Sequence, residues 1–186
     1  MTRTLSLGAF LMATGHHVSA WRHPDVPADG GLDFRLYKRL AQVAEAAKFD
    51  AVFVADSVAA PTAEIASRMA RSDHFEPLTL LSALAAVTER IGLIGTVTTS
   101  YNEPYHVARK FASLDHLSAG RAGWNLVTSD AAAEALNFNR QEHFGHAERY
   151  ARAREFHEVV TGLWDSWEDD AFTRDKASGQ YYDPAK

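Results

Sequence analysis

The chain has 186 residues, 46% of them apolar, and a formal net charge of −5. This apolar content suffices for one sizeable core, which excludes a disordered chain, and no basic stripe indicates nucleic-acid binding. Cysteine is absent, so disulfides, thiolate catalysis and zinc–thiolate sites are excluded. No apolar run reaches the roughly 20 residues needed to cross a membrane. We therefore expect neither a nucleic acid nor a membrane as partner.

The N-terminal segment has two interpretations. An early Arg3 and an apolar stretch beginning at Leu5 are features of a secretory signal. However, Ser6 and Gly8 interrupt the stretch, and its apolar residues alternate with the period of a strand. We therefore predict a first strand from about Leu5 to Phe10 and a cytoplasmic protein.

The remaining chain alternates between helix-like and strand-like segments. Helical periodicity predicts helices at 34–48, 76–92, 104–120 and 146–167. Short apolar runs predict strands at 49–56, 93–100 and 121–128. Three segments are expected to lack regular structure, namely 15–31, the charged segment 57–76 and the polar tail 168–186.

This order, βα repeated four times with near-continuous apolar strands, indicates a parallel sheet covered by helices. It fits either a four-stranded doubly wound sheet or half of an eight-stranded (β/α)8 TIM barrel. No glycine-rich phosphate loop follows the first strand. Polar residues at 56, 96–100 and 125–129 lie at strand ends, where barrel enzymes place their chemistry. A polar tail also stands where a fifth strand is due.

We therefore expect an α/β chain that supplies the first four βα units of a TIM barrel. Residues 1–186 would be the N-terminal half of a single barrel domain. Residues 168–186 would begin a loop or an insertion.

The fourth predicted strand contains an unexpected amide. In the stretch GRAGWNLVTS, Asn125 stands among apolar residues, where an unpartnered amide would cost about 1–3 kcal/mol. Either it bonds neighbouring backbone within the core, or it faces a bound molecule.

Two polar residues at the ends of other strands are also candidate ligand contacts. Asp56 ends the second strand, and its structural alternative is a helix cap or a salt bridge to Arg68 or Arg71. Thr96 lies in the third strand and shares a face with Thr98. Its alternative is plain strand propensity.

His146 and Tyr150 are four residues apart and share one face of the last predicted helix. Free N–H groups and the dipole at a helix start favour an anion there, but an exposed amphipathic pair is the alternative. Glu142, His143 and His146 do not form a recognised ligand set, so no metal is expected.

Three segments carry a family resemblance. DSVAAP, TVTTSYNEPYHVARKFASLDHLSAGRAGWNLVTS and ALNFNRQEHFGHAERYARAREFHEVVTGLWDSWEDDA resemble the nitrilotriacetate monooxygenase group of the bacterial-luciferase-like superfamily. The resemblance runs from about Leu5 to Asp183. It implies a TIM barrel that holds FMN at its C-terminal mouth. Positions matching the flavin contacts of the family are Asp56, Thr96, Asn125, His146 and Tyr150.

The resemblance also implies an activity. A separate NAD(P)H-dependent flavin reductase would supply FMNH2, and reaction with O2 would give a C4a-hydroperoxyflavin that oxygenates a small organic substrate. No nicotinamide cofactor is expected to bind this chain. Relatives carry a histidine at the position of His17, which could donate a hydrogen bond or act as catalytic acid or base. A solvated loop histidine is the alternative.

The family's chains are more than twice as long. The resemblance implies a homo-oligomer, such as a dimer. Association with the other half of the barrel is also expected, because half a barrel exposes two strand edges. Two alternatives stay open, namely a non-catalytic half-barrel that binds flavin or a partner, and an unrelated doubly wound domain.

Overall fold

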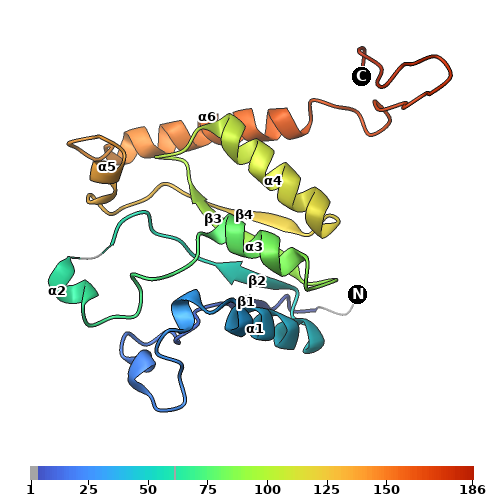
Figure 1. Ribbon diagram of the computed structural model, residues 1–186. Helices are drawn as coiled ribbons and strands as arrows, with labels where there is room; N and C mark the ends of the chain where they lie inside the picture. Colours follow the sequence, from blue (N-terminus) through green and yellow to red (C-terminus); the bar gives the residue numbers. More distant parts are fainter. Residues whose placement is uncertain (1–3, 61) are drawn as a thin grey trace.

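The computed structural model describes residues 4–60 and 62–186. Its centre is one parallel sheet in the order β1-β2-β3-β4 (Figure 1). The strands are β1 (Gly8–Phe10), β2 (Ala51–Val54), β3 (Gly92–Thr98) and β4 (Ala122–Val127). Each strand lies beside the next one in the chain, whereas a doubly wound sheet reverses its strand order. This topology confirms the first four βα units of a barrel.

The helices follow the strands in the predicted order. α1, α3 and α4 pack against β2, β3 and β4, and α6 packs against α4. The long helices are α1 (Phe34–Ala46), α3 (Pro77–Ala85), α4 (Pro104–Ser118) and α6 (His146–Trp164). The short ones are α2 (Ala63–Ala66), α5 (Glu134–Asn137) and the 3-10 turns η1 (Ala20–Arg22) and η2 (Gly30–Leu32).

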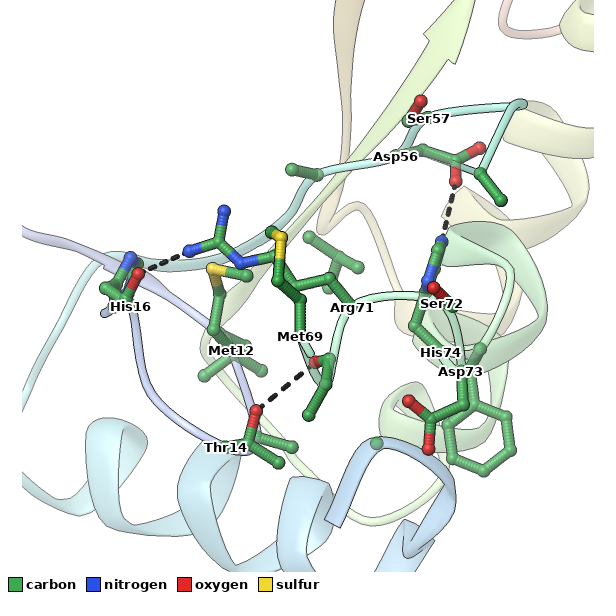
Figure 2. A pocket seen from close by; sticks show the side chains of 18 of the residues that line it. Met12, Thr14, His16, Asp56, Ser57, Met69, Arg71, Ser72, Asp73 and His74 are labelled. Atoms are coloured by element: carbon green, nitrogen blue, oxygen red, sulfur yellow. Dashed lines mark hydrogen bonds and ion pairs between the residues drawn. The ribbon is translucent and has the colours of Figure 1, made fainter. Parts of the chain in front are cut away.

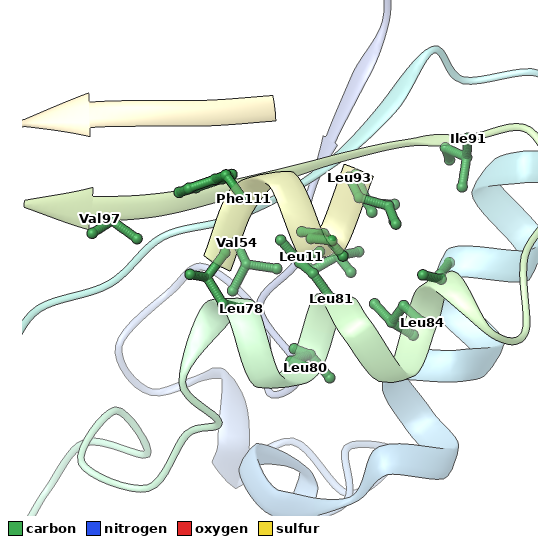
Figure 3. Close-up of a cluster of buried hydrophobic side chains, with 14 of the residues drawn as sticks. Leu11, Val54, Leu78, Leu80, Leu81, Leu84, Ile91, Leu93, Val97 and Phe111 are labelled. Atoms are coloured by element: carbon green, nitrogen blue, oxygen red, sulfur yellow. The ribbon is translucent and has the colours of Figure 1, made fainter. Parts of the chain in front are cut away.

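One face of the sheet forms the core. Leu93 and Val97 of β3 are buried against α3, where Leu81 and Leu84 are fully buried (Figure 3). Gly95 lies between them, and a Cβ there would come within 2.9 Å of the Leu81 side chain. A glycine is therefore needed at this position for the helix to lie close to the sheet.

The side chains on the opposite face change from apolar to polar along the strands. Phe10 of β1 and Phe53 of β2 face each other there, with ring centroids 4.8 Å apart. Towards the carboxyl end, Thr96 and Asn125 are register partners on the same face. This second face is thus apolar near one end and polar at the end where the sequence predicts chemistry.

The amino-terminal edge of the sheet is held by two charged side chains. The carboxylate of Glu45 accepts hydrogen bonds from three consecutive backbone N–H groups, of residues 89, 90 and 91, at 2.9, 2.7 and 3.0 Å. The Arg121 guanidinium donates to carbonyl oxygens of Ala85, Thr88, Ile91 and Ser118 and to the Thr88 hydroxyl, at 2.6–3.1 Å.

These contacts correct the prediction of one helix over 76–92. α3 ends at Ala85, because Glu45 and Arg121 take the backbone groups that a longer helix would have used. The helix predicted to reach residue 48 ends at Ala46, since Lys48 has a left-handed φ of 62°.

Two further boundaries differ, and one segment predicted to be irregular contains a helix. The first strand starts at Gly8, not Leu5, and the last helix ends at Trp164, not Trp167. The segment 57–76 contains the short helix α2, which carries no strong sequence signal. Arg3, part of the secretory-signal interpretation, lies outside the described residues.

The tail 168–186 is irregular apart from an isolated bridge between Asp175 and Gln180. Its aromatic side chains pack on one another, with the rings of Trp167 and Phe172 stacked at 4.7 Å. Its assignment as the start of an insertion stays a prediction. In the described residues, no helix is long and apolar enough to span the bilayer.

Candidate functional site

A cavity of about 680 Å³ opens at the carboxyl ends of β2, β3 and β4, and we call it the strand-end cavity. Its wall comes from the strand ends, the segment leading to α5, and the first turns of α6. Polar wall residues include Asp56, Ser57, Thr96, Thr98, Ser129, Glu134, His146, Arg149 and Tyr150. Side chains from distant parts of the sequence therefore meet at one edge of the sheet.

Thr96 lines this cavity, and Asn125, which is not itself one of the wall residues, forms a hydrogen-bonded pair with it. The Asn125 amide Nδ2 donates to the Thr96 hydroxyl oxygen at 2.9 Å. The amide bonds a side chain on the neighbouring strand, not core backbone, and its carbonyl oxygen makes no hydrogen bond within the described residues. This oxygen is an acceptor available to a bound molecule.

His146 and Tyr150 lie in the first turns of α6, with ring centroids 4.8 Å apart, and both line the cavity. Tyr150 is half exposed. The two rings therefore form a contiguous polar and aromatic patch next to the free N–H groups of the helix start. Their assignment as flavin contacts stays a prediction.

Two wall residues were not predicted from the sequence. Glu134 is 4% exposed, and its Oε2 has no hydrogen-bond partner in the described residues. The Arg149 Nε is likewise buried without a partner. Their spacing gives no signal, because charged residues on helices are usually solvated. Buried polar atoms normally find partners, so these two atoms mark a place where a ligand or water belongs.

The third unpartnered buried atom of the described residues lies in the same region. It is Nε2 of His143, whose Nδ1 is hydrogen-bonded to the Tyr101 hydroxyl. Burial and the negative charge of Glu134 raise the pKa of Tyr101, while Arg140 and Arg149 oppose this rise. This network ties the segment before α6 to the loop after β3.

A second cavity of about 680 Å³ lies between the loop after β1 and the segment 57–76, and we call it the loop cavity (Figure 2). Asp56 and Ser57 belong to the walls of both cavities. In the loop cavity, the Asp56 carboxylate pairs with His74 at 3.4 Å. This hydrogen bond raises the pKa of His74 against the opposing effect of burial.

The alternative of a salt bridge from Asp56 to Arg68 or Arg71 is therefore wrong, because His74 lies closer and occupies the carboxylate.

His17 lines neither cavity. Its Nδ1 instead accepts a hydrogen bond from the Ser19 N–H at 3.2 Å, and the side chain is exposed. The catalytic role of His17 stays a prediction.

No group of three or more metal-ligating side chains gathers within residues 4–60 and 62–186. The polar residues of the strand-end cavity are hydrogen-bonding and charged groups, which can bind an organic molecule with both donor and acceptor atoms.

Curated relatives cover almost the whole chain. N-acetyl-S-(2-succino)cysteine monooxygenase of Bacillus subtilis is 53% identical over 99% of this chain and 41% of its own length. Nitrilotriacetate monooxygenase component A of Aminobacter aminovorans is 47% identical over 96% of this chain and 42% of its own. The chain thus spans about two fifths of the length of these relatives.

Solved structures give the same result. The long-chain alkane monooxygenase structure matches with a TM-score of 0.92 and 39% identity, over 100% of this chain and 45% of that one. A riboflavin lyase solved with modified FMN and riboflavin matches at 0.87 with 36% identity, over 99% of this chain and 43% of that one. The family model for luciferase-like monooxygenases matches residues 9–186. The chain therefore belongs to the luciferase-like monooxygenase family.

Proposed function

We propose that this chain provides the flavin-binding half of an FMNH2-dependent monooxygenase, with the flavin in the strand-end cavity. The observation that supports this most is the Asn125–Thr96 pair, in which a free amide oxygen lies next to Thr96, a residue that lines the same cavity as Asp56, His146 and Tyr150. Family membership and the FMN named in the riboflavin lyase structure support the same cofactor.

The strand-end cavity fits a flavin in size and chemistry. Its volume lies within the range of about 300–1,000 Å³ typical of cofactor sites. A flavin has a polar edge with carbonyl and N–H groups, and an amide can match both. The unpartnered Arg149 Nε and Glu134 Oε2 supply a further donor and acceptor.

The residues proposed to contact the flavin then have defined tasks. Asn125 and Thr96 orient the polar edge of the ring, and Asp56 closes the cavity towards the loop side. Arg149, His146 and Tyr150 lie at the start of α6, where positive charge and free N–H groups suit the FMN phosphate. When bound, the reduced flavin supplies the electrons that activate O2.

The proposal includes partners outside this chain. A separate NAD(P)H-dependent flavin reductase would deliver the reduced flavin, and a small organic substrate would enter from the loop side. His17 would approach that substrate from the loop after β1. The protein would act as a homo-oligomer or together with the other half of the barrel.

Replacing Asn125 with leucine in the full-length product of the reading frame tests the flavin assignment. We expect FMN affinity to fall about tenfold to hundredfold, since a hydrogen bond to a buried partner is lost. Titration of flavin fluorescence measures the affinity, and O2 consumption with supplied FMNH2 measures turnover. A wild-type protein that binds flavin without consuming O2 beyond the free-flavin rate would indicate a non-catalytic flavin carrier.

Gln42→Leu is the matched control. Gln42 is also an amide with one hydrogen bond, to the Val87 carbonyl at 2.9 Å, but Val87 lines neither cavity, whereas the partner of Asn125 is the wall residue Thr96. We expect the Gln42→Leu variant to bind FMN with the same affinity as the wild type. Equal affinities for both variants would refute the assignment of Asn125.

A further inference from the structure

The loop cavity contains a cationic side chain without an acidic partner. The Arg71 guanidinium donates one hydrogen bond, to the carbonyl oxygen of His16. Within residues 4–60 and 62–186, no carboxylate oxygen lies within 4.0 Å of it. A guanidinium has five N–H donors in a planar fork. Most of these donors are therefore available to a ligand, although the side chain is partly buried.

The two carboxylates in the same wall are directed elsewhere. Asp56 is paired with His74 at 3.4 Å. Figure 2 shows the Asp73 carboxylate on the far side of its loop from the Arg71 guanidinium. The carboxyl carbon of Asp73 lies beside Gly31, 3.2 Å from the position that a Cβ would take there. Neither carboxylate neutralises Arg71.

The rest of the wall is largely apolar and adaptable. It includes Leu11, Val54 and Phe75, together with the thioethers of Met12 and Met69. Methionine side chains adjust to irregular shapes. A mostly apolar cavity with one uncompensated cation is suited to a small organic molecule that carries a negative group.

The loop cavity also adjoins the proposed flavin site, because Asp56 and Ser57 line both cavities. A molecule held by Arg71 would therefore lie beside the flavin and not at a remote surface. This step relies on the proposed function, since it assigns the loop cavity to the substrate.

We propose that the loop cavity binds a small organic carboxylate and that Arg71 selects it by donating paired N–H groups to the two carboxylate oxygens. The planar fork of arginine matches a carboxylate in this bidentate geometry. His74 lines the same wall but is paired with Asp56, so Arg71 is the group in this wall that can bind the carboxylate. Arg71 is thus a specificity-determining residue that contacts the substrate.

Binding of thiodiglycolate and of its uncharged diamide, which have the same skeleton, tests this proposal. Isothermal titration with the flavin-free, full-length product should show the dicarboxylate bound at least about tenfold tighter than the diamide. In Arg71→Gln this preference should disappear, and in Arg71→Lys it should be intermediate, because lysine keeps the charge but not the fork.

Arg68→Gln is the matched control, since Arg68 lies on the same segment, is exposed, and is absent from the cavity wall. It should keep the wild-type preference. A wild-type protein that binds the dicarboxylate no tighter than the diamide, or not at all, overturns the proposal. So does an Arg71→Gln variant that keeps both its circular dichroism spectrum and the preference.

FMN titration on the same samples separates the two proposals. Retained FMN affinity in Arg71→Gln with a lost carboxylate preference supports both. Failure of the wild type to bind FMN, with the preference present, refutes the flavin site and leaves the carboxylate site standing.

Discussion

The two edges of the sheet differ in how completely their polar groups are paired. At the amino-terminal edge, Arg121 makes five hydrogen bonds and Glu45 accepts three. In the described residues, three buried polar side-chain atoms have no hydrogen-bond partner, and all three lie at the carboxyl edge. They belong to Glu134, His143 and Arg149.

This contrast separates stability from function in one small sheet. Saturated polar groups hold elements in place, whereas unpaired buried groups cost free energy and are kept where a ligand completes them. In barrel enzymes the same division holds between the bottom face and the top face. Variants at the amino-terminal edge should therefore change stability, and variants at the carboxyl edge should change binding.

Of the variants considered, Arg121→Met should change the free energy of unfolding the most. It removes five hydrogen bonds that connect the end of α3, the start of β3 and the end of α4, so we expect the free energy of unfolding to fall by roughly 3 kcal/mol. Urea denaturation measures the change. Arg90→Met is the control, because the Arg90 side chain is 77% exposed, and it should stay within about 0.5 kcal/mol. Equal stability of both variants would contradict a structural role for Arg121.

Glu45→Gln should have a smaller effect that depends on pH. Although partial burial opposes it, hydrogen bonds from the N–H groups of Arg90, Ile91 and Glu89 lower the pKa of Glu45. A lowered folded-state pKa adds stability above the unfolded value of about 4.3, and this stability is lost as the pH falls through the folded pKa.

At neutral pH, we expect Glu45→Gln to cost about 1 kcal/mol, because the hydrogen bonds lose their charge assistance. The cost should vanish in acid, as unfolding curves collected down to low pH would show. Glu89→Gln, at a side chain that is 84% exposed, should leave the pH profile unchanged. A cost for Glu45→Gln that persists below the folded pKa would contradict the linkage.

Glu134→Gln should change the free energy of unfolding the least, and it should raise this free energy where the other two variants lower it. Its Oε2 is buried without a partner, so removing the charge should raise the free energy of unfolding by about 0.5 kcal/mol, a gain typical of strained functional positions. Thermal unfolding at neutral pH measures this. Destabilisation would mean that Glu134 supports the fold and does not serve a ligand.

The order and type of the main elements could be predicted from local sequence, because apolar periodicity is a property of each segment. Their ends could not. α3 stops at Ala85 since Glu45 and Arg121, distant in sequence, take the following backbone groups. Such contacts exist only once the sheet has assembled.

The candidate site was predicted in part. Asp56, Thr96, His146 and Tyr150 line one cavity, because the carboxyl ends of parallel strands share an edge and α6 begins beside it, whereas Asn125 lies outside the wall. Glu134 and Arg149 were missed, as nothing in a short polar segment or a charged helix indicates that a side chain is buried and unpaired. The Asp56–His74 contact depends on how the segment 57–76 folds back, which no period in the sequence encodes.

The alternation along β4 has a consequence for how this protein can vary. Trp124 points towards the helices, where its ring lies 5.9 Å from those of Phe111 and Phe156, whereas Asn125 points to the opposite face and bonds Thr96. A one-residue insertion or deletion before Trp124 would exchange the two faces. The indole would then enter the side of the proposed flavin site, and the amide would enter the aromatic cluster. Length changes in this strand should therefore abolish folding and flavin binding together, whereas substitutions can affect one without the other.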